Sequence, residues 1–134
     1  MNDGAEMQAV LHAALEREAA CYTAALQTAA EQAAACGCGE PIDDRLQQVF
    51  ARLGEVAEQE ARIAAVKRQW DEAGRPAGPA LRAVLDRLAT LIRQLSRELH
   101  AIEEAARARR DQLAAELDVC NRRRQMQRAY LRKS

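Results

Sequence analysis

Cysteine and histidine are the residues in this 134-residue sequence that come closest to forming a chemical site. Four cysteines and two histidines would be enough for a zinc ion, which thiolates and imidazoles bind. Only Cys36 and Cys38 are close neighbours, and a redox or metal role for them would need a second pair of ligands, for example from another subunit. On a helix, Cys21 would lie about 22 Å from Cys36. We therefore predict no metal or cofactor, with Cys21 and Cys120 acting as small apolar residues.

The remaining reactive side chains do not form a catalytic group in the sequence. His12 and His100 each adjoin a leucine and are expected at the flank of a helix. The sequence has no nucleophile elbow, no phosphate-binding glycine loop and no H-E-x-x-H motif, and Glu103-Glu104 is an isolated carboxylate pair. Because nothing brings a nucleophile, a base and an oxyanion donor together, we predict that the protein is not an enzyme.

The elements that position these residues are predicted to be helices. The sequence is 49% apolar but only 3% aromatic, with 6 glycines and 3 prolines, a composition that favours helix over strand. Glycine and proline cluster at residues 36–41 and 74–79, which predicts helices over about 3–35, 41–72 and 79–132. We expect one all-α domain, an elongated antiparallel three-helix coiled-coil bundle. A cytoplasmic location is expected, because the sequence has no run of membrane-spanning length and no signal-like start.

The middle helix carries the clearest heptad pattern. Its apolar positions alternate in steps of three and four, broken at Glu60 and Lys67, which we expect to extend towards solvent and set the register. We expect Trp70 to pack at the base of the third helix, around Leu81 and Leu85. The seam residues are Ile42, Leu46, Val49, Leu53, Val56, Glu60, Ile63, Lys67 and Trp70, flanked by Phe50, Ala57 and Ala64, which widen the stripe enough to contact two neighbouring helices.

The third helix is predicted to be longer than its partners. At 1.5 Å per residue it would span roughly 80 Å against roughly 50 Å for each of the others, passing the first turn near residue 111. About twenty C-terminal residues would then have no helix of this chain beside them, although they carry an apolar stripe that needs cover. The open alternatives are a fold-back after residues 118–121, self-association, or a partner protein. The stripe residues are Leu113, Leu117, Val119, Met126, Tyr130 and Leu131.

Charge is divided between the two halves of the chain. Residues 1–66 carry 4 arginines and 11 acidic residues, whereas residues 67–134 carry 16 basic and 9 acidic residues. The two halves are expected to attract each other, which selects a register more than it stabilises the fold. After Asp118 the chain has six bases and no acid, a basic amphipathic segment. This segment is suited to an acidic or helical partner, or it is simply a solvated helix end.

These helical patterns resemble a known family. The first helix has the form L-x-x-x-L-x-x-E over residues 11–18, and the last has Cys120-Asn121, Gln125-Met126-Gln127 and Ala129-Tyr130. Together they resemble the FlgN-type export chaperones of flagellar type III secretion, although such chaperones are often acidic overall whereas this chain is neutral. The resemblance implies a cytoplasmic chaperone whose last helix shields a segment of a hook–filament junction protein.

From the resemblance we predict a partner-binding extension over residues 113–134, with a protein client. The predicted contact residues are Leu113, Leu117, Cys120, Met126, Tyr130 and Leu131. The alternative is a structural coiled-coil scaffold in which the extension forms a homodimer. A helical protein that binds nucleic acid is a third candidate; Arg122–Arg124 would then give strongly salt-dependent binding, but only Tyr130 in this segment offers a ring for stacking. No membrane partner is expected.

Overall fold

The computed structural model describes residues 3–38 and 43–132, and almost all of them are helical. The three helices are α1 (Asp3–Gly37), α2 (Asp43–Ala73) and α3 (Pro79–Arg132), and the described residues contain no strand. The predicted all-α class is confirmed, and the helix ends that can be compared agree within two residues. The predicted start of the second helix at residue 41 lies outside the described residues. No helix in the described ranges is long and apolar enough to cross a membrane.

The residues between α2 and α3 explain locally why one helix ends and the next begins. Gly74 has a φ of +62°, a conformation that costs glycine little, and its N–H donates to the carbonyl of Asp71 at 3.1 Å to close α2. Pro79 opens α3, where a missing N–H and a fixed φ are no disadvantage. The N–H of Arg82 then donates to the carbonyl of Gly78 at 2.9 Å, which is the first turn of the helix.

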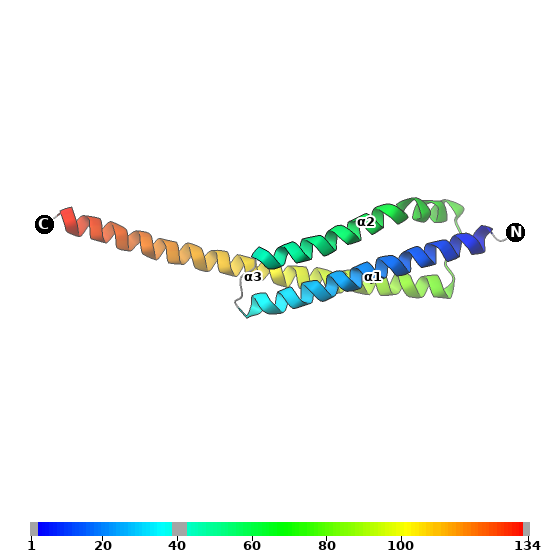
Figure 1. Ribbon diagram of the computed structural model, residues 1–134, viewed down its shortest axis with the longest axis horizontal. Coiled ribbons are helices and arrows are strands. Elements are labelled where there is room, and N and C mark those ends of the chain that lie inside the picture. Colours follow the sequence, from blue (N-terminus) through cyan, green and yellow to red (C-terminus); the bar gives the residue numbers. More distant parts are fainter. Residues whose placement is uncertain (1–2, 39–42, 133–134) are drawn as a thin grey trace.

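Helix α1 packs against both other helices, and Figure 1 shows that it lies between them near its N-terminal end and crosses α3 further along. Its side chains meet α2 in reverse order along the chain, since Glu18 pairs with Lys67 and Gln32 bonds to Gln48, so that α1 and α2 are antiparallel. Glu16 pairs with Arg87 of α3, 71 residues later, and the two helices run in the same direction. With this offset α1 ends level with about residue 107 of α3.

The core is one apolar seam on each helix. Helix α2 contributes residues at steps of seven, as in a coiled coil, and α3 does the same over its first half. The short side chains of α1 let both neighbours approach it. The buried apolar residues are Leu11, Ala14, Leu15, Ala19, Tyr22, Ala25 and Ala29 of α1, Val49, Val56, Ile63 and Trp70 of α2, and Leu81, Val84, Leu88, Leu95 and Ile102 of α3.

The bundle is open between α2 and α3. Among the described residues, no Cα atom of α2 lies within 8 Å of one of α3. The predicted widening of the α2 stripe at Phe50, Ala57 and Ala64 is therefore not matched by a second helix, although its last residue, Trp70, borders a hollow together with Leu81 of α3. Phe50, Ala57 and Ala64, which widen that stripe, are exposed, with 63% of Phe50 accessible. An apolar pattern shows which side of a helix avoids water, but it does not show whether the same chain supplies the cover.

Candidate protein-binding site

A cluster of polar side chains interrupts the core between α1 and α2. Glu18 of α1 is buried, and Lys67 Nζ of α2 lies 3.3 Å from its Oε2. This ion pair does not have hydrogen-bond geometry, so Oε2 has no hydrogen-bond partner among the described residues. One turn away, the hydroxyl of the buried Tyr22 donates to Glu60. Glu60 and Lys67, the polar residues in the heptad pattern of α2, thus lie opposite Tyr22 and Glu18 of α1. These contacts fix the register of α1 against α2.

The environment of this cluster shifts two pKa values. Burial raises the pKa of Glu18 above its ordinary value of 4.5; Lys67 opposes this effect, and Glu60 adds to it. Burial and the hydrogen bond to Glu60 raise the pKa of Tyr22. Both shifts favour uncharged forms inside the bundle, and Lys67 is the member of the cluster that borders a hollow, whose other lining residues are mostly apolar. We assign the cluster a structural role.

The cysteines and histidines do not gather in the structure. Among residues 3–38 and 43–132, no three His, Cys, Asp or Glu side chains lie close enough to hold a metal ion. Cys38 and Cys120 are exposed, while Cys21 and Cys36 are half-buried. His12 lies 3.8 Å from Glu16, and His100 lies 3.7 Å from Glu104, each one turn along its own helix. The structure therefore brings together no ligand set from these residues.

The second half of α3 is bare. Every residue from 107 to 132 is exposed, and this segment, which we call the tail, projects about 39 Å beyond the other helices (Figure 1). The tail begins at residue 107, about one helical turn before the position near residue 111 that the helix lengths predict, because Glu16 of α1 pairs with Arg87 of α3, 71 residues later. The helix runs unbroken through residues 118–121, so the possible fold-back does not occur. Residues 133 and 134 of the predicted extension lie outside the described residues.

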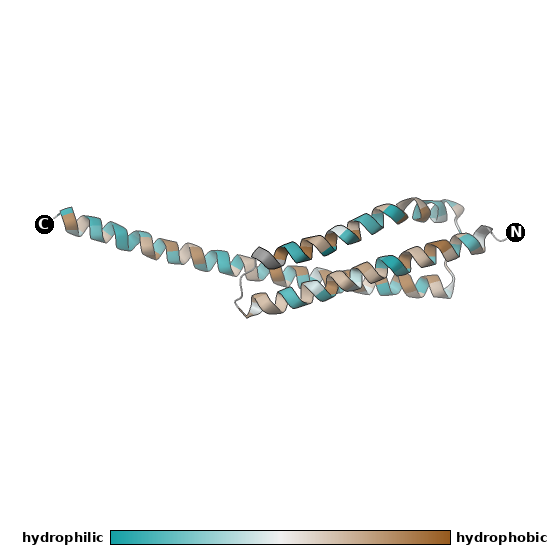
Figure 2. Ribbon diagram, viewed as in Figure 1, coloured by the Kyte–Doolittle hydropathy of each residue, from teal (hydrophilic) through white to brown (hydrophobic). Residues whose placement is uncertain are grey.

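The apolar side chains of the tail fall on two strips, and Figure 2 shows apolar residues recurring along it. Leu113 follows Leu95 by eighteen residues, about five turns, and so continues the buried side of α3. Leu117, Cys120 and Leu131 share this side, and we call these four residues the seam strip. The outer strip lies roughly a third of a turn away. It consists of Val119, Met126 and Tyr130, with 83% of Tyr130 accessible.

All six predicted contact residues are exposed, but the structure does not bring them together on one face. Leu113, Leu117, Cys120 and Leu131 belong to the seam strip, and Met126 and Tyr130 belong to the outer strip. Val119, which completes the outer strip, and Cys120 of the seam strip border the same surface hollow of about 450 Å³, beside Ala115. The tail therefore presents one apolar surface made of two strips.

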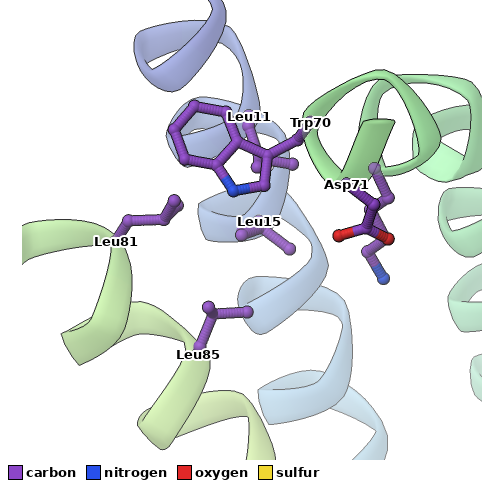
Figure 3. Close-up of a pocket in the computed structure, with 7 residues that line it drawn as sticks. Leu11, Leu15, Trp70, Asp71, Leu81 and Leu85 are labelled. Carbon is purple, nitrogen blue, oxygen red and sulfur yellow. The ribbon is translucent and has the colours of Figure 1, made fainter. Parts of the chain in front are cut away.

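A second apolar surface lies on the open side of the bundle. A hollow of about 350 Å³ is lined by Leu11 and Leu15 of α1 and by residues of both other helices (Figure 3). Figure 3 shows Trp70 reaching towards Leu81, and Leu85 lies on the same hollow, as predicted for Trp70. The residues of α2 and α3 on this hollow are Lys67, Trp70, Asp71, Leu81 and Leu85.

The hollow is one end of a longer apolar track. Positions seven residues apart stay on one side of a coiled-coil helix, so Ile92 and Leu99 extend the line of Leu85 along α3. Ala64, Ala57 and Phe50 extend the line of Asp71 along α2 in the same way. We call this track, with the hollow, the open face. The sequence did not predict this face, on which 42% of Leu85 and 43% of Ile92 are accessible. The available signal was the apolar flank of α2, which was assigned to an internal contact.

Charge differs sharply between the tail and the bundle. The tail has eight arginines and three acidic residues, whereas α1 and α2 together have twelve acidic and six basic residues. Within the tail, Arg122 pairs with Asp118 at 3.4 Å, and Arg107 pairs with Glu103 just before it at 2.7 Å. These local pairs leave a net charge of +5 on the tail. Its surface is therefore both apolar and basic.

Comparison with known proteins found no matching family model, no matching curated protein and no matching solved structure.

Proposed function

We propose that this protein is a non-enzymatic chaperone whose tail binds and shields an amphipathic helical segment of a partner protein. The observation that carries the proposal is the bare apolar surface of the tail. A helix with large apolar side chains in water gains by packing against another helix, at roughly 1.5–3 kcal/mol for each large side chain that becomes buried. Four or five such anchors are enough for micromolar affinity after the cost of ordering the partner.

The charge of the tail indicates the chemistry of the partner. A net charge of +5 over residues 107–132 favours a segment with acidic residues beside its apolar stripe. The resemblance of the helices to FlgN-type chaperones supplies the more specific form of the proposal. In that form the client is the C-terminal segment of a flagellar hook–filament junction protein, bound in the cytoplasm before export.

The proposal can be tested by titrating the full chain with labelled peptides from the C-terminal segments of junction proteins and following fluorescence anisotropy. We expect Met126→Glu and Tyr130→Glu each to weaken binding at least tenfold, because each places a charge on an apolar contact. Gln125→Glu is the matched control, since it adds the same charge to the same turn but off both strips. It should change the Kd less than threefold.

A truncated chain that ends at Gln112 provides the second variant. It keeps every buried residue, so the bundle retains its core, but it lacks most of the tail. Binding of the peptide to this chain as tightly as to the full chain would overturn the proposal. If instead the tail binds RNA or DNA, with affinity falling steeply between two salt concentrations, and no junction peptide, the chaperone reading is also wrong.

A further inference from the structure

The protein has two bare apolar surfaces, and each fits the other in length. The covered part of α3 runs from residue 79 to about residue 106, and the tail that follows has 26 residues. A tail is therefore nearly as long as the open face beside the covered part. It cannot reach the open face of its own molecule, because α3 continues straight away from it.

We propose that two copies of this chain form an antiparallel dimer in which the tail of each lies on the open face of the other. The two α3 helices then run side by side in opposite directions about a two-fold axis. This axis lies near Arg109, just beyond the end of α1. Each bundle gains a fourth helix, and the seam strip of each tail and the open face of each bundle cover one another in a closed two-fold interface.

The sides of the helices agree with this arrangement. The seam strip continues, along the tail, the side of α3 that packs on α1 in the first half of that helix. The open face lies next to this side. Leu113 and Leu117 then face the second copy's α3 between its residues 99 and 106. The tip of the tail, at Arg132, comes level with roughly residue 86 of the second copy, beside the hollow that Asp71 lines.

Charge favours this pairing over a dimer in which the two tails pack against each other. If the two tails packed against each other, a charge of +5 would meet a charge of +5. On the open face, each tail instead lies against α2, with a net charge of −2, and against residues 79–106 of α3, with a net charge of zero, while α1, with a net charge of −4, lies beneath.

The outer strip stays free in this dimer. Val119, Met126 and Tyr130 lie roughly a third of a turn from the seam strip, and they point away from the second copy. The dimer and the proposed client therefore use different sides of one helix. The dimer does not rest on the proposed function, and each can fail without the other.

Sedimentation equilibrium of the full chain is the first test. We expect a species of twice the 14.8 kDa chain mass. Ile92→Glu on the open face and Leu117→Glu on the seam strip should each weaken the dimer at least tenfold. Met126→Glu is the matched control and should leave the dimer unchanged. Far-UV circular dichroism checks that each variant keeps its helices. A wild-type chain that stays monomeric at 100 µM overturns the proposal, and so does a dimer that Met126→Glu weakens but Leu117→Glu does not.

A distance measurement distinguishes the two pairings. With Cys21, Cys36 and Cys38 replaced by alanine, a spin label on the native Cys120 reports the separation of this residue between copies. We expect about 33 Å when each tail lies on the other bundle, because the two labels are then on opposite sides of the two-fold axis. In a dimer of paired tails, Cys120 lies close to the axis, and the distance falls below about 15 Å. That result would overturn the proposed pairing.

Discussion

Lys67→Met tests the role of the polar cluster between α1 and α2. In the native protein, Lys67 Nζ lies 3.3 Å from a carboxylate oxygen of the buried Glu18. Removal of this cation leaves the buried Glu18 beside Glu60 without the positive charge that lowers its pKa. Breaking a fully buried ion pair in this way costs 3–5 kcal/mol. Because 42% of the Lys67 side chain is accessible, we expect a smaller loss, about 2–3 kcal/mol at pH 7.

The pH dependence of this loss has a definite sign. Burial raises the pKa of Glu18 in the folded protein, and Lys67 opposes that rise, so Lys67→Met raises the pKa further. A carboxyl group with a raised pKa binds its proton more tightly in the folded chain, and stability therefore falls as the pH rises from the unfolded value towards the folded pKa. The loss of unfolding free energy caused by Lys67→Met should reach its full size at pH values above the pKa that Glu18 has in the variant. It should shrink towards zero below pH 4.5, where Glu18 is protonated in both states.

Urea unfolding followed by circular dichroism measures both effects, with wild type and variants at one protein concentration. Glu18→Gln removes the charge and nearly keeps the shape, so we expect the Lys67→Met/Glu18→Gln double variant to recover at least half of the loss. The difference in unfolding free energy between variant and wild type at the same pH cancels the contribution from titration of all other carboxylates. The reasoning is refuted if Lys67→Met costs the same at pH 4 and pH 7, or if the double variant is as unstable as Lys67→Met alone.

Three further predictions test the fold. Gly54→Ala should stabilise the protein by about 0.5–1 kcal/mol, because no atom outside its own helical turn lies within 4 Å of the added methyl group. Gly74→Ala should destabilise the protein by about 1 kcal/mol, because Gly74 has a positive φ. The urea midpoints of the two variants should therefore shift in opposite directions. Trp70→Ala should cost about 3 kcal/mol in the same assay, and the exposed Val10→Ala less than about 0.5 kcal/mol; equal losses would contradict the core assignment. Truncation after Gln112, measured where both chains are monomeric, should change stability by less than about 1 kcal/mol, and a larger loss would mean that the tail packs on its own bundle.

The sequence predicts the helices well because their signals are local. Glycine and proline mark both breaks, and seven-residue spacing identifies the buried side of α2 from Val49 to Trp70. The charge division also has a structural counterpart. Lys67 and Arg87, both from the basic half, pair with Glu18 and Glu16 of the acidic half.

What the sequence leaves undetermined depends on contacts between distant residues. The pattern marks Glu60 and Lys67 as breaks in the seam, but their partners, Tyr22 and Glu18, follow only from the register between α1 and α2. The start of the tail depends similarly on the offset between α1 and α3. The open face cannot be predicted from the apolar flank at Phe50, because that flank is equally compatible with a third helix of this chain or with a helix from another molecule.

The neutral net charge of the chain supports an intermolecular role for the tail. The ion pairs that join α1 to its neighbours use basic residues that lie within the bundle, at positions 67 and 87. In the part of the chain that the structure describes, Arg107 and Arg122 of the tail pair with acidic residues of α3 itself, Glu103, Glu104 and Asp118. A charge of +5 is thus spread along a segment that extends about 39 Å past the acidic helices that would balance it. An antiparallel second copy brings these opposite charges together over the full length of the tail, which a single extended molecule cannot do.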